Sequence, residues 1–176
     1  GAVVGRATPI NDKRNVWGYI ASLTFTWQYY TDILMVDFEG FSVVRRDLIK
    51  HVPLDMINTE RYVDAVVRQK GFKVVFAPKA ITYTKQPDNL KDFLNQKRRN
   101  IFGHFQQKQM NIDAPHINPR RVLPLILKSL RLGKIFWTGI MVTLWSISYV
   151  LAWNDFKKGR SYVRWKTITS ANKLSA

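Results

Sequence analysis

The order of apolar and polar positions divides the chain into short strand-like runs and longer helical stretches. The strand-like runs are residues 1–6, 33–38, 41–45, 72–76 and 80–84. Apolar residues at helical spacing, or clear start and stop signals, mark helices over 15–30, over 58–70 and after Asp88. Strands that alternate with helices in this way predict an α/β fold.

Two of the predicted helices have defined ends. Asn58 can cap the first of them, Glu60 places a carboxylate in its first turn, and Gly71 suits its C-terminal stop. Asp88 is the expected cap of the next helix. That helix carries an apolar stripe formed by Leu90, Phe93, Leu94, Ile101 and Phe105.

The longest apolar run lies near the C-terminus. Residues 135–153 contain 19 positions without a charge, with Trp137 and Trp153 near the ends. At about 1.5 Å per residue, a helix of this length roughly spans a hydrocarbon core. A long buried helix of a soluble protein is the alternative, but the basic residues on both flanks favour a spanning or deeply inserted helix. We predict an interfacial amphipathic segment over 119–134, a transmembrane helix over 135–153 and a basic tail over 154–176.

The charge of the chain favours anionic partners. It has 28 Lys and Arg against 12 Asp and Glu, a net charge of +16. Nucleic acid, an acidic membrane surface and phosphate-bearing substrates are the classes that this excess attracts. No nucleic-acid motif is present and the basic residues are spread along the chain, which argues against nucleic acid. The chain has no Cys and three separated His, so the sequence predicts neither a disulfide framework nor a zinc site.

Two groups of residues could carry chemistry. Glu60, at the start of a helix, could act as a general base, although an ordinary first-turn acid is the simpler interpretation. Gln96, Arg99 and Asn100 share one helix face, opposite the apolar stripe. Arginine there could hold a phosphate by forked hydrogen bonds, whereas a solvated basic face is the alternative.

The spacing of these residues forms a wider pattern. Gly40 precedes a strand that ends in paired arginines, Glu60 lies 11 positions before Gly71, and Gln96 lies 36 positions after Glu60. A strand from Lys73 to Pro78 falls between them. In this order and spacing, residues 40–107 resemble the acceptor half of a family 2 glycosyltransferase, the group that contains cellulose, chitin and hyaluronan synthases.

The resemblance implies a fold and an activity. Residues 1–118 would be the C-terminal, acceptor part of a GT-A-like domain. Glu60 would be the catalytic base of an inverting transfer, and the substrate-binding residues would be Gly40, Gln96, Arg99 and Asn100. The partners would be a nucleotide-sugar donor, a lipid-linked or glycan acceptor, and lipid of the cell membrane, with the catalytic part on the cytoplasmic side. The family's Trp is Asn100 here and its Asp base is Glu60, which argues against processive synthesis and leaves single-sugar transfer.

The donor half of such an enzyme has no counterpart in the sequence. No D-x-D motif occurs, and residues 1–6 resemble the strand that follows that motif in the family. We therefore expect this chain to be part of a longer protein or to pair with a separate donor-half polypeptide, and to be inactive alone. A divalent metal, Mg or Mn, would enter only through that half. A catalytically inactive membrane scaffold with the same fold is the first alternative, and a basic protein that binds acidic lipid or nucleic acid is the second.

Overall fold

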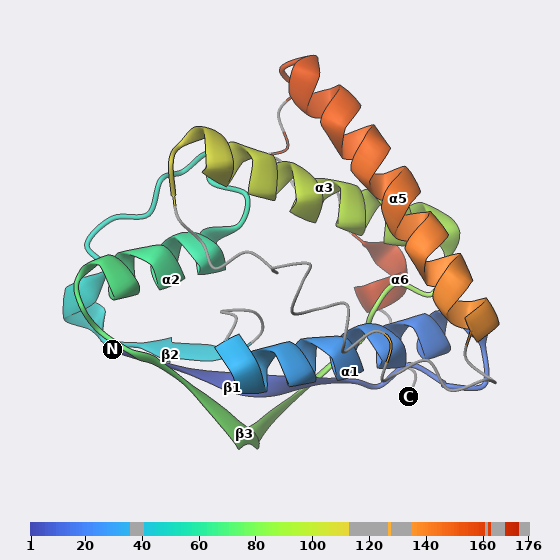
Figure 1. Ribbon diagram of the computed structural model, residues 1–176, viewed down its shortest axis with the longest axis horizontal. Helices are drawn as coiled ribbons and strands as arrows, with labels where there is room; N and C mark the ends of the chain where they lie inside the picture. Colours follow the sequence, from blue (N-terminus) through green and yellow to red (C-terminus); the bar gives the residue numbers. More distant parts are fainter. Residues whose placement is uncertain (36–40, 113–126, 128–134, 161, 163–167, 173–176) are drawn as a thin grey trace.

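The computed structural model describes residues 1–35, 41–112, 127, 135–160, 162 and 168–172 (Figure 1). Its strands are β1 (Ala2–Pro9), β2 (Ser42–Val44) and β3 (Val74–Thr84). Its helices are α1 (Val16–Met35), α2 (Thr59–Gln69), α3 (Leu90–Gln109), α5 (Ile135–Lys157) and the short α6 (Thr169–Asn172), with a 3-10 turn at Arg46–Leu48. This mixture of strands and helices confirms the predicted α/β class at the coarse level.

The three strands form one sheet in the order β2-β1-β3. β1 is antiparallel to β2 and parallel to β3. Alternate residues of β1 point to opposite faces, so Ala2 and Val4 are buried while Val3 is exposed. The buried pair packs against Val67 of α2, which covers that face of the sheet. The sheet therefore holds the C-terminal half of α2 through a small apolar core.

Strand β3 is continuous, although the sequence predicted two strands separated by Pro78. Gly5 pairs with Ala77 and the next residue, Arg6, pairs with Ile81, so three residues of β3 have no pairing partner in β1. This bulge removes Pro78 from the hydrogen-bonded ladder, where its missing N–H would otherwise leave a gap. Gly5 makes room for it, because a Cβ atom there would lie 2.6 Å from the Ala80 carbonyl oxygen.

Helix α1 is longer than expected. Residues 33–35, which we predicted to begin a strand, form its last turn, and 36–38 lie outside the described residues. A short apolar run such as Ile33–Met35 carries no periodicity that would separate a strand from a helix end. Ile20 and Leu23 of α1 pack with Phe93 of α3 and Met141 of α5, forming a second apolar cluster.

Helix α3 lies at the centre of the packing (Figure 1). Its N-cap is Asn89, whose side chain accepts a hydrogen bond from the Asp92 N–H at 2.9 Å, so the predicted cap, Asp88, is one residue too early. Phe102 and Ile57 pack with Ala152 of α5 in a third apolar cluster. Beside it, the buried carboxylate of Asp155 binds Arg98, Arg160 and Tyr162.

Helix α5 covers the predicted apolar run and continues to Lys157. Among the described residues, α5 is the one helix whose length and composition would allow it to cross a membrane. Only 22% of its most apolar window is buried, whereas the core helix of a soluble protein is mostly buried. Most of the predicted interfacial segment, 119–134, and the predicted domain boundary at 118 lie outside the described residues.

Candidate active site

The start of α2 is tied to α3 by hydrogen bonds. Asn58 stands at the N-cap position, but its side chain makes no capping bond. Its amide instead donates to the Asn100 carbonyl oxygen at 3.0 Å, and its own carbonyl oxygen accepts from the Gln107 side chain at 3.0 Å. The contact is close, because a Cβ atom on Gly103 would lie 2.5 Å from the Asn58 side chain. These bonds fix the first turn of α2, and with it Glu60, against α3.

A cleft of about 180 Å³ lies at this junction. Its walls combine residues from the start of α2 with residues from the middle of α3. The lining residues are Ile57, Asn58, Glu60, Arg61, Arg99, Asn100 and His104. Three of the predicted site residues, Glu60, Arg99 and Asn100, thus meet in one cleft.

Two predicted residues are not placed in it. Gly40 lies outside the described residues. Gln96 lies about one helical turn before Asn100 and is not among the residues that line the cleft. Its side-chain oxygen is buried and accepts no hydrogen bond from any described residue. Gln96 therefore stands beside the cleft with an unused acceptor rather than inside it.

The cleft carries two guanidinium groups and one carboxylate. Arg61 is only 5% exposed, whereas Glu60 is exposed. Burial lowers the pKa of the Arg99 guanidinium, and the negative charge of Glu60 opposes that shift. Burial also raises the pKa of nearby Asp64, although Arg68 donates to that carboxylate at 2.8 Å. Such a site can bind an anion in its depth and accept a proton at its mouth.

Arg61 and His104 also line the cleft, although the sequence prediction did not include them. His104 follows Asn100 by four positions and therefore lies on the same helix face. Extending the face of Gln96 and Asn100 by one turn would have found it. Arg61 directly follows Glu60, but nothing in the sequence separates a buried arginine there from a solvated one.

The neighbouring arginine, Arg98, has a different environment from Arg99. Its guanidinium binds the buried carboxylate of Asp155, near the C-terminal end of α5. Consecutive residues on a helix point about 100° apart, so one arginine faces the cleft and the next faces α5. Arg98 and Arg99, which are adjacent in the sequence, therefore lie on two sides of α3.

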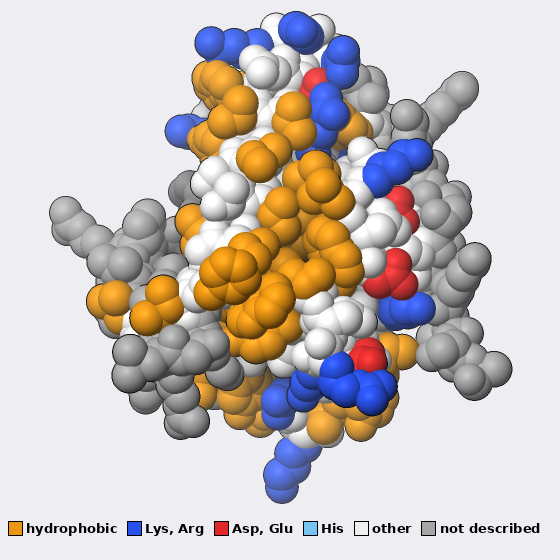
Figure 2. Space-filling view, turned by 90° about the vertical axis from the view of Figure 1, so that its right-hand side faces the viewer, with side chains coloured by type: hydrophobic (Ala, Val, Ile, Leu, Met, Phe, Trp, Pro, Cys, Tyr) orange, Lys and Arg blue, Asp and Glu red, His pale blue; other side chains and the backbone are white. Residues whose placement is uncertain are grey.

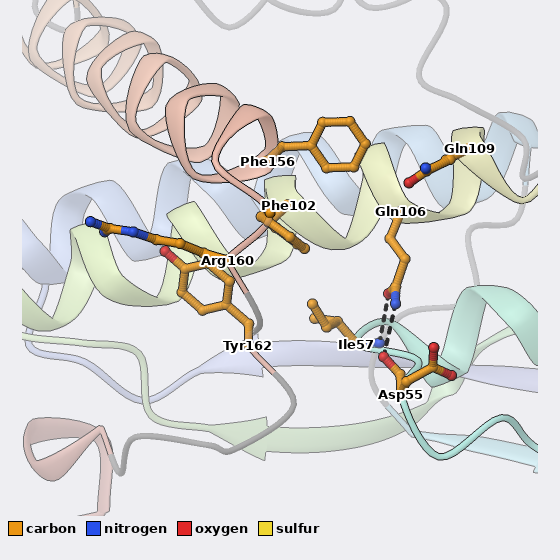
Figure 3. Close-up of a pocket in the computed structure, with 9 residues that line it drawn as sticks. Asp55, Ile57, Phe102, Gln106, Gln109, Phe156, Arg160 and Tyr162 are labelled. Atoms are coloured by element: carbon orange, nitrogen blue, oxygen red, sulfur yellow. Dashed lines mark hydrogen bonds between the residues drawn. The ribbon is translucent and has the colours of Figure 1, made fainter.

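A second pocket, of about 330 Å³, lies next to the cleft and shares Ile57 with it (Figure 3). The side chains around it are mostly aromatic or polar, and they come from α3, the segment before α2, the end of α5 and the residues after it. They are Asp55, Ile57, Phe102, Gln106, Gln109, Phe156, Arg160 and Tyr162, together with Gly159. Gln106 is held in place, because its amide oxygen accepts from the Ile57 N–H at 3.1 Å and its NH₂ donates to the Asp55 carbonyl oxygen at 2.8 Å. Aromatic walls with amide and carboxylate groups at the rim suit a polar ring compound such as a sugar.

Metal ligands do not gather in the described part of the chain. No group of three or more His, Cys, Asp or Glu side chains there could hold a metal ion. No step of the chemistry below is therefore routed through a metal.

A comparison with known families gives the class of the chain. A family model described as glycosyl transferase family group 2 matches residues 65–166, more than half of the 176 residues. The match includes α3, with Gln96, Arg99 and Asn100, and all of α5. No curated protein and no solved structure gave a significant match. Because the family model covers more than half of the chain, including every described element from β3 to α5, the chain belongs to glycosyl transferase family group 2.

Proposed function

We propose that this chain forms the acceptor-side part of a membrane-associated, inverting glycosyltransferase. The donor is a nucleotide sugar, and the acceptor is a lipid-linked sugar or a glycan. The observation that carries this proposal is the meeting of Glu60 with Arg99 and Asn100 in one cleft. A carboxylate that can accept a proton and a half-buried guanidinium that can hold a phosphate then lie at one site.

The reaction is a single displacement at the anomeric carbon of the donor sugar. Glu60 accepts the proton of an acceptor hydroxyl, whose oxygen forms the new bond to the anomeric carbon. The bond between that carbon and the diphosphate oxygen breaks, and the electron pair leaves with the diphosphate. Arg99, with Arg61 close by, supports the negative charge that develops on the leaving group.

The proposal includes a donor half outside this chain. The donor-binding residues and any divalent metal belong to that half, which is a further part of the same protein or a separate polypeptide. The exposed residues of the sheet, Val3, Val43 and Val75, occupy neighbouring positions on three strands. This apolar face is available for such a partner.

Arg99→Ala should weaken binding of the nucleoside diphosphate product and slow transfer in the intact enzyme. The lost charged hydrogen bonds are worth about 1.5–3 kcal/mol, which corresponds to roughly a 10- to 150-fold loss of affinity. Product inhibition measures this directly. Arg46→Ala is the matched control, because Arg46 is an exposed arginine outside the cleft. If product inhibition were the same in both variants, Arg99 would be only part of a solvated helix face.

Membrane association rests on α5. Its exposed face is apolar, and lysines follow at its C-terminal end. Because an inserted apolar helix is insensitive to salt, the full chain should stay on membranes through high-salt washes and come off in detergent.

Replacing Val142 and Val150 together by Lys should release the chain from zwitterionic phosphatidylcholine vesicles. Both valines are exposed on α5, so the change leaves the packed face intact. A lysine at full depth in hydrocarbon costs about 2.5–3.5 kcal/mol, and each substitution should lower the partition coefficient by roughly tenfold or more. Leu54→Lys is the control, since Leu54 is 96% exposed and lies in the loop before α2, outside α5. Equal vesicle binding by the two proteins would remove α5 as the anchor.

A further inference from the structure

One face of α5 packs along the protein over nearly the whole length of the helix. Its buried residues are Thr138, Met141, Ser148, Ala152 and Asp155. Near the start of the helix, the ring of Trp137 lies 5.7 Å from the ring of Tyr19 in α1. Near its end, Asp155 binds Arg98 of α3. Both ends of α5 therefore contact the same body.

The segment after α5 returns to that body as well. The ring of Tyr162 lies 5.0 Å from the ring of Phe102 in α3. In α6, the Ser170 N–H donates to the Asp92 carboxylate in the first turn of α3 at 3.0 Å. Helix α5 and the described residues after it thus pack against α3, a helix that precedes α5 in the chain.

The outer face of α5 has the character of a lipid-contacting surface. No charged residue occurs from Ile135 to Trp153. Figure 2 shows apolar side chains gathered along the middle of this side of the molecule, with Lys and Arg around them. The large exposed apolar residues of the helix are Ile135, Phe136, Val142, Ile147, Tyr149, Val150 and Trp153.

The hydroxyl groups of Thr143 and Ser146 on this outer face are already satisfied within the helix. Thr143 donates to the Gly139 carbonyl oxygen and Ser146 donates to the Val142 carbonyl oxygen, each at 2.9 Å. In hydrocarbon an unsatisfied donor costs several kcal/mol, so this arrangement removes the main polar obstacle to burial in lipid. The outer face is suited to acyl chains rather than to a polar protein partner.

A crossing of the bilayer by α5 conflicts with these contacts. With 23 residues the helix is about 35 Å long, close to the roughly 30 Å of a hydrocarbon core. A crossing would place α3 and the residues after α5 on opposite sides, yet Tyr162 and Ser170 both contact α3. It would also draw α3 into the hydrocarbon with Lys97, Arg98 and Arg99, which is strongly unfavourable.

We propose that α5 lies in the plane of the membrane surface, with its outer face among the acyl chains and its inner face on α1 and α3. This inference rests on the proposed membrane association and assigns the bilayer surface as the partner of the outer face. Lys157 and Lys158, exposed at the C-terminal end, add attraction to anionic head groups. Helix α3 and the described residues after α5 then lie on one side of the membrane, together with the cleft.

The test uses single cysteines, because the full chain contains none. Gln69→Cys reports the side of the cleft, Lys158→Cys the segment after α5, and Val150→Cys the outer face. Leu54→Cys is an exposed control off α5. Each variant is treated with a membrane-impermeant maleimide in membrane vesicles of one defined orientation. We expect positions 69, 54 and 158 to react from the same side at similar rates. Position 150 should react on the order of tenfold more slowly until detergent is added.

Three results would overturn the inference. Reaction of position 158 only from the side opposite position 69 would show that α5 crosses the bilayer. Reaction of position 150 as fast as position 54 in intact vesicles would show that the outer face is not in lipid. Absence of the protein from the vesicles would also remove membrane association from the proposed function. Sugar transfer and product inhibition, measured on the Glu60 and Arg99 variants, do not depend on any of these results.

Discussion

Glu60→Gln should slow sugar transfer by the intact enzyme by about 10²–10⁴-fold while leaving nucleoside diphosphate binding unchanged. The amide keeps the size and the hydrogen-bonding shape of the side chain but cannot accept the acceptor proton. Diphosphate binding rests on Arg99 and on the donor half, so it reports whether the cleft is intact. The measurement is single-turnover transfer with product binding measured in parallel.

Asp88→Asn is the matched control for this variant. Asp88 is an exposed carboxylate near the start of α3, and it does not line the cleft. Its replacement should leave both transfer and diphosphate binding unaltered. Turnover in the Glu60 variant equal to that of the control would exclude Glu60 as the base. It would favour the interpretation of the chain as an inactive scaffold.

The largest loss of stability is expected for Asp155→Ala. The Asp155 carboxylate is 2% exposed and accepts hydrogen bonds from Arg98, Arg160 and Tyr162. Burial, together with the bond to Asp155, raises the pKa of Tyr162 to about 12, so the tyrosine stays a proton donor at physiological pH. Removing the carboxylate leaves Arg98 partly buried without its counter-charge. The expected cost is about 3–5 kcal/mol of unfolding free energy, measured by chemical unfolding in detergent.

Two further variants make this prediction specific. Asn154→Ala changes the exposed neighbour of Asp155 and should cost little. Replacing Arg98 by Met together with Asp155 by Leu removes both charges, and should recover much of the lost stability because no unpaired ion remains. Asp155→Ala with the stability of Asn154→Ala would show that the ion pair does not hold α5 to α3.

The sequence predicted the helices and strands better than it predicted the contacts between them. The start of α2 at Asn58 and its stop at Gly71 were recognisable from local chemistry, and the stop is confirmed by the positive φ of 77° at Gly71. The continuity of β3 through Pro78 was not recognisable, because it depends on Gly5 in another strand. The role of Asn58 as a bridge to α3, instead of a cap, likewise depends on a contact between residues far apart in the sequence.

For the site, residue spacing predicted which side chains share a helix face, but the sequence did not predict which side chains are buried. The face shared by Arg99 and Asn100 follows from helical periodicity, and the structure places both in the cleft with Glu60. That Arg98 turns away to Asp155, and that Arg61 is buried, depends on packing that no local pattern encodes. The same holds for α5. Its length and composition indicate affinity for lipid, but the in-plane orientation that we propose for it rests on contacts at both of its ends.

The division of α3 into two sides has a consequence for the acceptor. Arg99 and Asn100 line the cleft, whereas Arg98 and Phe105 contact α5 on the other side of the same helix. With α5 in the membrane surface as proposed, the cleft would stand about one helix diameter, roughly 10–12 Å, above it. A sugar carried on a lipid, with its phosphate at head-group level, would reach that height without leaving the bilayer. A free polysaccharide would have to be captured from solution, so we propose that the height of the cleft favours acceptors that diffuse in two dimensions.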